Sequence, residues 1–159
     1  MIGISYLFVM SFIFLAFSCE NDAKLIVVDA TVDILVLDPR ANNILEMDNF
    51  KEENIKIYYL VNGKKELFNR PNLDYPKGYA ILKNQKEQLI LRVFLNSDLE
   101  APFTFIDYGD SDIDTIKSEF HRNGQSVISI KIWYNDQLKW ESGNEDFSEL
   151  RTFSITKTL

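Results

Sequence analysis

The stretch that decides the fold is TIKSEFHRNGQSVISIKIWYNDQLKWE, residues 115–141. It contains three runs of alternating side chains, separated by Asn123-Gly124 and Asn135-Asp136. Dipeptides of this kind accept the positive φ angles that the tight turns of β-hairpins require. Two tight turns between three strand patterns predict an antiparallel meander. The middle run is expected to place four large apolar side chains on one face, namely Ile128, Ile130, Ile132 and Tyr134.

The same period-two alternation recurs elsewhere in the chain. The segment from Lys24 to Leu37 is rich in β-branched residues, so we expect a strand or a strand with a bend. A second Asn-Gly pair, Asn62-Gly63, predicts another hairpin. Further strands are expected at residues 54–61, 64–68, 79–82, 87–95, 103–108 and 149–157.

These strand patterns, with no long helical pattern and no repeat, predict an all-β domain over residues 25–159. We expect two packed antiparallel sheets, a sandwich of immunoglobulin-like or transthyretin-like type. A small β-barrel is the alternative. The polar residues 44–53 are expected to form a loop or a short helical turn.

The N-terminal segment has a different character. From Ile2 to Ser18 every residue is apolar or small and uncharged, and the run ends at Cys19, the single cysteine of the chain. A bilayer-spanning helix needs ~20 apolar residues, and a signal peptide has a shorter apolar region. We therefore expect residues 1–18 to be a helical lipoprotein signal peptide. A transmembrane anchor is the alternative, because the segment lacks the Lys or Arg that usually opens a signal peptide.

The residues Ala16, Phe17 and Ser18 before Cys19 resemble a bacterial lipobox in its relaxed form, since Phe17 is bulky for its position. The resemblance implies cleavage before Cys19 and acylation of its thiol and its new amino group. The three acyl chains would then hold the protein firmly on the membrane, since stable anchoring usually takes two lipid signals. Residues 19–24 would form the lipidated cysteine and a solvated tether.

Several segments together resemble a group of uncharacterised Bacteroidetes-type surface lipoproteins with a compact β-sandwich. They are the lipobox-like cysteine, NIKIYYLVNGK at 54–64, GDSDIDTIK at 109–117 and IKIWYNDQLKW at 130–140. The resemblance implies an outer-membrane lipoprotein exposed at the cell surface. It implies no activity and no functional residues.

Composition limits the classes of function. The chain carries a formal net charge of −7, and none of its charged residues lies in Met1 to Ser18. An acidic domain is poorly suited to nucleic acid, whose binding depends on basic patches. With no second cysteine, an intramolecular disulfide is impossible. We expect no cofactor.

The sequence offers little for catalysis. The single histidine, His121, stands just before a predicted hairpin turn, and no serine lies in a G-x-S-x-G context. A histidine at the end of a hairpin is usually a solvated surface residue. We therefore expect a protein that is not an enzyme.

An acidic cluster is the best candidate for a metal site. Asp110, Asp112 and Asp114 supply hard oxygen ligands at alternating positions, which suits calcium. As an EF-hand loop the segment fails, because Thr115 stands at the glycine position and His121 at that of the bidentate glutamate. On a strand, neighbouring carboxylates of the cluster would lie about 7 Å apart. A solvated acidic start to the next strand is therefore favoured over a metal site.

Aromatic residues are the better lead to a binding surface. They could stack on a sugar, line a groove for a protein partner or fill the core of the sandwich. Trp133 is favoured as exposed because its strand face is expected to include Ser129 and Lys131. The candidates are Phe103, Phe105, Tyr108, Trp133 and Trp140.

Together these features predict a lipid-anchored, non-catalytic protein of the cell envelope that binds a protein or glycan partner. One alternative is a structural or assembly component that pairs through a sheet edge. A carbohydrate-active enzyme is the third hypothesis.

Overall fold

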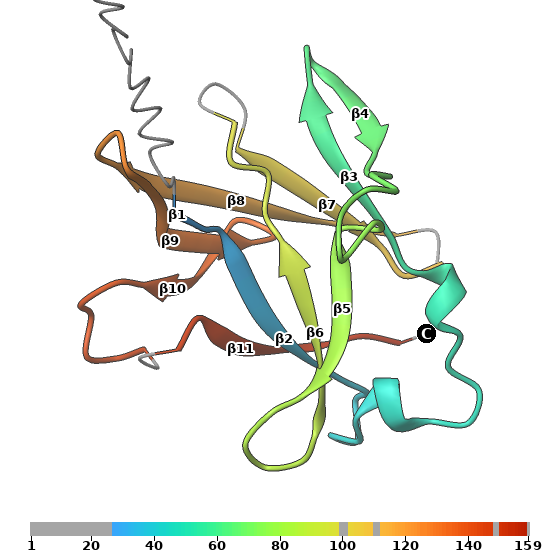
Figure 1. The fold of residues 1–159 in the computed structure, drawn as a ribbon. Coiled ribbons are helices and arrows are strands. Elements are labelled where there is room, and N and C mark those ends of the chain that lie inside the picture. The colour runs from blue at the N-terminus through green and yellow to red at the C-terminus, as the bar shows by residue number, and fades with distance from the viewer. Residues whose placement is uncertain (1–26, 99–101, 110–111, 148–149, 159) are drawn as a thin grey trace, which may run out of the picture.

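The fold is taken from a computed structural model, which describes residues 27–98, 102–109, 112–147 and 150–158. The predicted signal peptide at 1–18, Cys19 with its tether at 19–24, and Asp110 lie outside these residues. The described residues form eleven strands and two short 3-10 helices, η1 (Ile44–Glu46) and η2 (Glu52–Asn54) (Figure 1). The prediction of an all-β fold is confirmed.

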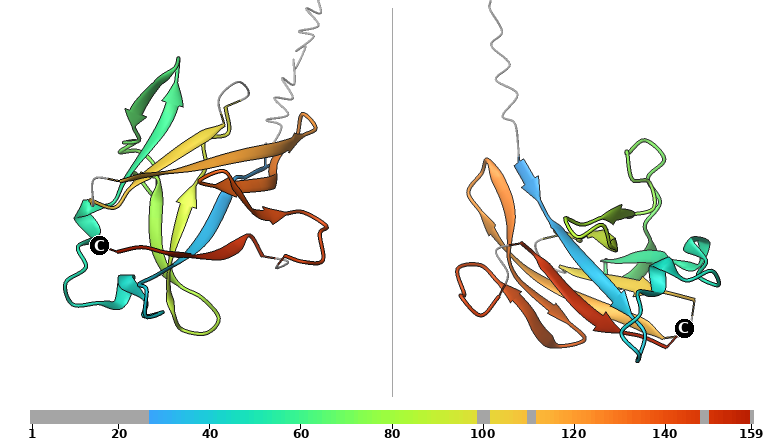
Figure 2. Two further views of the ribbon diagram at one scale, coloured as in Figure 1. Left: turned by 180° about the vertical axis from the view of Figure 1, so that it is seen from behind. Right: turned by 90° about the horizontal axis from the view of Figure 1, so that it is seen from below.

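The strands form two sheets, seen from the front in Figure 1 and from behind and below in Figure 2. We name them sheet A and sheet B. Sheet A has the order β1 (Val27–Asp29), β9 (Ser126–Tyr134), β8 (Ile113–Arg122), β7 (Phe103–Asp107), β3 (Lys56–Val61), β4 (Lys64–Leu67), and β10 (Gln137–Glu141) also pairs with β9. Sheet B has the order β11 (Thr152–Thr156), β2 (Thr31–Leu37), β6 (Leu89–Phe94), β5 (Tyr79–Lys83).

The expectation of purely antiparallel sheets is wrong, because each sheet contains one parallel pair. In sheet A, β1 runs parallel to β9, and in sheet B, β11 runs parallel to β2. The first strand also changes sheets: β1 pairs in sheet A, Ala30 interrupts it, and β2 continues in sheet B. Figure 2 shows this blue segment running from one sheet to the other. The predicted strand with a bend is therefore confirmed, and it links the two layers.

The core lies between the two sheets and is built from alternate residues of their strands. In β2, for example, every second side chain is buried. Complete burial of one such Leu or Ile side chain stabilises the fold by roughly 1.5–3 kcal/mol. The largest fully buried apolar side chains are Val32, Ile34, Val36, Ile57, Leu91, Val93, Ile106, Ile116 and Ile132.

Two of the predicted hairpin turns have the backbone that their sequence requires. Both residues of Asn62-Gly63, between β3 and β4, have positive φ angles, at 50° and 74°. Both residues of Asn135-Asp136, between β9 and β10, do so as well, at 47° and 63°. Asn, Asp and Gly tolerate this conformation better than other residues. The turns therefore fix the register of the strands that they join.

The expected face of β9 is only partly correct. Ile132 and Tyr134 are buried as predicted, but Ser129 is buried in place of Ile128 and Ile130. The register between β8 and β9 shifts at Glu119/Phe120, which is a β-bulge. One extra residue in a strand reverses which side chains point inward beyond it.

No helix in the described part of the chain is long and apolar enough to cross a membrane.

Candidate functional site

The side of sheet A that faces away from sheet B carries a cluster of aromatic and aliphatic side chains; we call it the outer face. In β7, Thr104 and Ile106 are fully buried, so the alternate residues Phe103 and Phe105 project from the opposite side of the sheet. In β9, Trp133 lies between the buried Ile132 and Tyr134 and projects in the same direction. Strand pairing then determines which side chains are neighbours on this face.

Two rows of side chains cross the outer face from strand to strand. In the first row, Phe103 pairs with Lys117, Lys117 with Trp133, and Trp133 with Leu138. Directly paired side chains in adjacent strands are close enough to pack together. The second row lies two residues further along the strands. It consists of Leu67, Tyr58, Phe105 and Thr115.

Two lysines of the outer face lie over aromatic rings. The Lys65 Nζ lies 4.4 Å from the centre of the Phe105 ring, and the Lys117 Nζ lies 5.4 Å from the Trp133 ring. A cation within about 6 Å of an aromatic face is attracted to the ring quadrupole. Among the described residues neither ammonium group forms an ion pair. The rings therefore hold both charges in place without neutralising them.

Further charges on the face are Lys131, Glu141 and the exposed Glu119, which lies opposite Lys131 on β8. The Lys131 Nζ lies 2.7 Å from a carboxylate oxygen of Glu141. This contact lowers the pKa of Glu141 and raises the pKa of Lys131. Lys131 and Glu141 neutralise one another, and the two rows contain no carboxylate. The two rows are therefore cationic and aromatic, with Glu119 as a carboxylate beside them, although the chain as a whole is acidic.

The structure divides the five aromatic candidates between two locations. Phe103, Phe105 and Trp133 lie on the outer face, although Phe105 is only 8% exposed. Tyr108 and Trp140 are 3% and 6% exposed and belong to the core. The register of β10 shifts between Leu138 and Trp140, which brings Trp140 opposite the buried Ile132. The candidates therefore do not form one platform.

The acidic cluster is not a set of equivalent solvated carboxylates. Asp112 is exposed, whereas Asp114 is 2% exposed, so the expected solvated strand start is wrong for Asp114. The Tyr134 hydroxyl donates to one Asp114 oxygen at 2.5 Å, and the Asn135 amide donates to the other at 2.7 Å. The Lys157 Nζ lies 3.0 Å from Asp114. The Asp114 carboxylate is therefore already paired with an ammonium group.

Tyr134 contributes to this network as a neutral donor. Burial, followed by the neighbouring Tyr108 and Asp114, raises the pKa of Tyr134 well above its usual range. The hydroxyl therefore remains protonated and can donate to the carboxylate of Asp114. The described residues include no group of three or more His, Cys, Asp or Glu side chains that could hold a metal.

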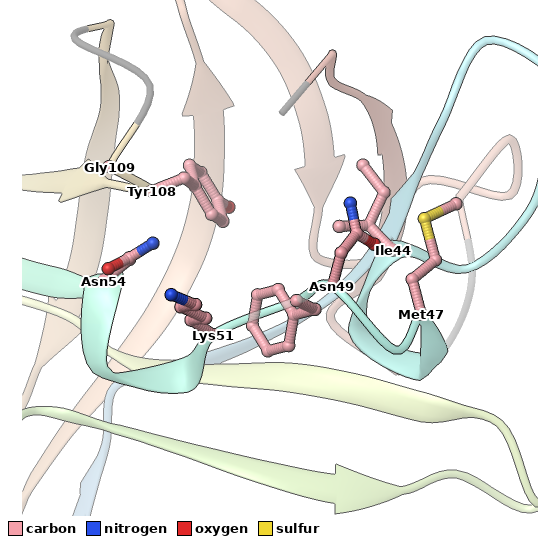
Figure 3. Close-up of a pocket in the computed structure, with 8 residues that line it drawn as sticks. Ile44, Met47, Asn49, Lys51, Asn54, Tyr108 and Gly109 are labelled. Carbon is pink, nitrogen blue, oxygen red and sulfur yellow. The ribbon is translucent and has the colours of Figure 1, made fainter.

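A small cavity lies between Tyr108 and the segment that contains η1 and η2 (Figure 3). Its volume is about 170 Å³. Lys51, Asn54 and Gly109 line it together with Ile44. Ligand pockets usually have volumes of about 300–1,000 Å³. This cavity is therefore smaller than a typical site for an organic ligand.

A larger groove of about 450 Å³ lies where β1 passes into β2, next to the end of β6. Its walls are mostly apolar and include Val28, Leu73, Tyr75 and Phe94. The Tyr75 and Phe94 rings stack with their centres 5.0 Å apart. No single stretch of sequence marks this groove, because its residues come from β1, β2, β3, β6 and the loop after β4. Its polar groups do not indicate a particular ligand.

His121 lies in an exposed position near the end of β8, as its place before the turn predicts.

Comparisons with family models, with curated proteins and with solved structures find no match for this chain. The immunoglobulin-like or transthyretin-like type of the sandwich therefore stays a prediction. The function of the chain has to be inferred from the geometry of its own surface.

Proposed function

We propose that this chain is a lipid-anchored protein of the cell envelope, on the outer membrane and exposed at the surface, and that it binds a partner without catalysis. The binding surface in this proposal is the outer face of sheet A. The resemblance to Bacteroidetes-type surface lipoproteins supports the location. The partner is a glycan or a protein.

The observation that carries the proposal is the row of Phe103, Lys117, Trp133 and Leu138 across four strands. Leu138 is exposed, and Phe103 and Trp133 are only partly covered. Aromatic side chains presented on a rigid surface, together with cationic groups, are typical of interaction sites. The sheet beneath holds them in fixed positions, so little conformational entropy is lost when a partner binds.

The proposed anchor would keep the domain near the membrane. Seven residues separate Cys19 from Val27, where β1 begins. A chain of this length spans at most ~25 Å when fully extended. Acylation of Cys19 would therefore keep the domain close to the bilayer.

Assembly through the β4 edge of sheet A has less support. The edge strand β4 carries Lys64 and Lys65, and all four of its residues are exposed. Lysines on an edge strand hinder pairing with another chain. The outer face, rather than this edge, is therefore the favoured contact surface.

Binding can be measured by the tryptophan fluorescence of the purified full-length protein across an array of polysaccharides and envelope proteins. A partner on the outer face is expected to shift the emission of Trp133, and Trp133→Ala is expected to abolish both shift and binding. The matched control is Leu73→Ala, an exposed apolar side chain in the loop after β4. Equal binding by Trp133→Ala and wild type would refute the proposed surface. Products of hydrolysis would refute the absence of catalysis.

The anchor is tested separately by Cys19→Ala in cells. Loss of acylation is expected to release the protein from the membrane fraction. Firm retention of the variant would favour a transmembrane anchor instead.

A further inference from the structure

We propose that the ligand of the outer face is an anionic polysaccharide, with sugar rings stacked on Phe103 and Trp133 and acidic groups bound by Lys65 and Lys117. This inference rests on the proposed function, because it names the ligand class for the same surface. Its basis is the juxtaposition of two unneutralised ammonium groups with aromatic rings on one rigid sheet.

The two lysines supply charge that a ligand can use. Among the described residues, Lys65 and Lys117 contact aromatic rings and no carboxylate. A lysine already paired with a carboxylate, such as Lys131 with Glu141, would have to give up that contact first. An anionic group that approaches Lys65 or Lys117 breaks no existing ion pair. Charge complementarity therefore favours an acidic ligand at this position.

The spacing of the rings suits a chain of sugars. Phe103 and Trp133 lie on β7 and β9, on either side of Lys117 on β8. Adjacent strands are about 4.8 Å apart, so the two side chains are separated by about 10 Å. This separation is comparable to the length of a disaccharide unit. Alternate sugars could stack on the rings while an acidic group between them meets Lys117.

The surface is less suited to an acidic peptide. An extended peptide usually binds at a sheet edge, where free backbone groups form hydrogen bonds. On the outer face the central strands β7 and β8 are paired on both sides, so their backbone groups are used within the sheet. Only side chains are available there. Stacking and ion pairing, rather than backbone pairing, must provide the affinity.

The net charge of the protein makes the test selective. At −7, the chain as a whole repels a polyanion. Any binding of an anionic polymer must therefore depend on a local cationic site.

Isothermal titration of the full-length protein tests the inference with polygalacturonate and dextran sulfate as anionic polymers and dextran as the neutral one. The variant is Lys65→Gln/Lys117→Gln. Both side chains are exposed, so the fold is retained, which thermal unfolding checks. The control is Lys83→Gln/Lys86→Gln, which removes two exposed charges at the far end of β5. We expect wild type and control to bind an anionic polymer, and Lys65→Gln/Lys117→Gln to bind at least about tenfold more weakly, or about 1.4 kcal/mol.

Other results separate the inference from the proposed function. If dextran binds as tightly as the anionic polymers, and Trp133→Ala alone removes binding, the inference is overturned and the binding surface remains. If polyglutamate binds as tightly as polygalacturonate, the ligand is an acidic protein segment and the inference is overturned. Failure of both anionic polymers to bind wild type also overturns it, while the array with Trp133→Ala still tests the surface.

Discussion

The buried contact between Lys157 and Asp114 gives the sharpest prediction for stability. Asp114 lies on β8 of sheet A, and Lys157 follows β11 of sheet B, where its backbone N–H donates to Leu37 at 2.8 Å. The Lys157 side chain is 9% exposed, and the Asp114 side chain is 3% exposed. The ion pair therefore connects the two sheets at the end of the chain. Its removal is expected to weaken the whole sandwich.

Lys157→Met removes the ammonium but keeps the volume of the side chain. Breaking a buried ion pair by removing one partner costs about 3–5 kcal/mol, because the other charge stays buried. Tyr134 and Asn135 still donate to Asp114, so we expect a loss at the lower end, about 3 kcal/mol. For a domain of this size the midpoint of thermal unfolding would fall by about 10 °C.

Chemical denaturation at pH 7 measures the change in the free energy of unfolding. Lys83→Gln is the matched control, because the Lys83–Glu87 pair is exposed and its loss is expected to have no measurable effect. The double variant Asp114→Asn/Lys157→Met should lose less than the sum of the single variants, because the two residues share one contact. Additive losses, or a loss below about 1 kcal/mol for Lys157→Met, would refute a buried ion pair between the sheets.

Two further predictions concern other buried groups. Ser118→Ala and Ser129→Ala are each expected to leave the free energy of unfolding unchanged or raise it by up to about 1 kcal/mol, because neither hydroxyl has a hydrogen-bond partner among the described residues. A loss above about 1 kcal/mol by denaturation would show a missing partner. Burial and then Glu52 raise the pKa of Tyr79 from 10.0 to about 12. The stability that Tyr79 contributes is complete below pH 10 and is lost as the pH rises to 12, so Tyr79→Phe should flatten the fall in stability over that range. An equally steep fall in the stability of the variant over that pH range would contradict the raised pKa of Tyr79.

The strands and turns were predictable because local sequence encodes them. Asn62-Gly63 and Asn135-Asp136 adopt the positive φ angles that their residue types allow, and the strands on both sides follow from alternation. The parallel pair of β1 with β9 was not predictable in this way. It joins residues about a hundred positions apart, and no local pattern specifies such a partner. Only the packing of the complete chain brings the two strands together.

The same limit applies to the candidate site. Asp114 resembles an exposed acidic residue in the sequence, but Lys157, which makes its burial possible, lies more than forty residues away. Trp140 and Ser129 are buried because register shifts in β10 and β9 change which side chains point inward. Trp133 could be identified from the alternation between Ile132 and Tyr134. Lys117, whose ammonium lies over the Trp133 ring, comes from the neighbouring strand β8. Its contact with Trp133 could be predicted only from the register between β8 and β9.

The most direct test of the proposed binding surface is to map the contact of polygalacturonate on the full-length protein by NMR. Backbone amide shifts are expected to change on β7, β8 and β9, with the largest changes at Phe103, Lys117 and Trp133. They are expected to stay constant around the apolar groove, at Tyr75 and Phe94. Changes centred on the groove, with constant shifts at Trp133, would contradict the assignment of the outer face as the binding surface.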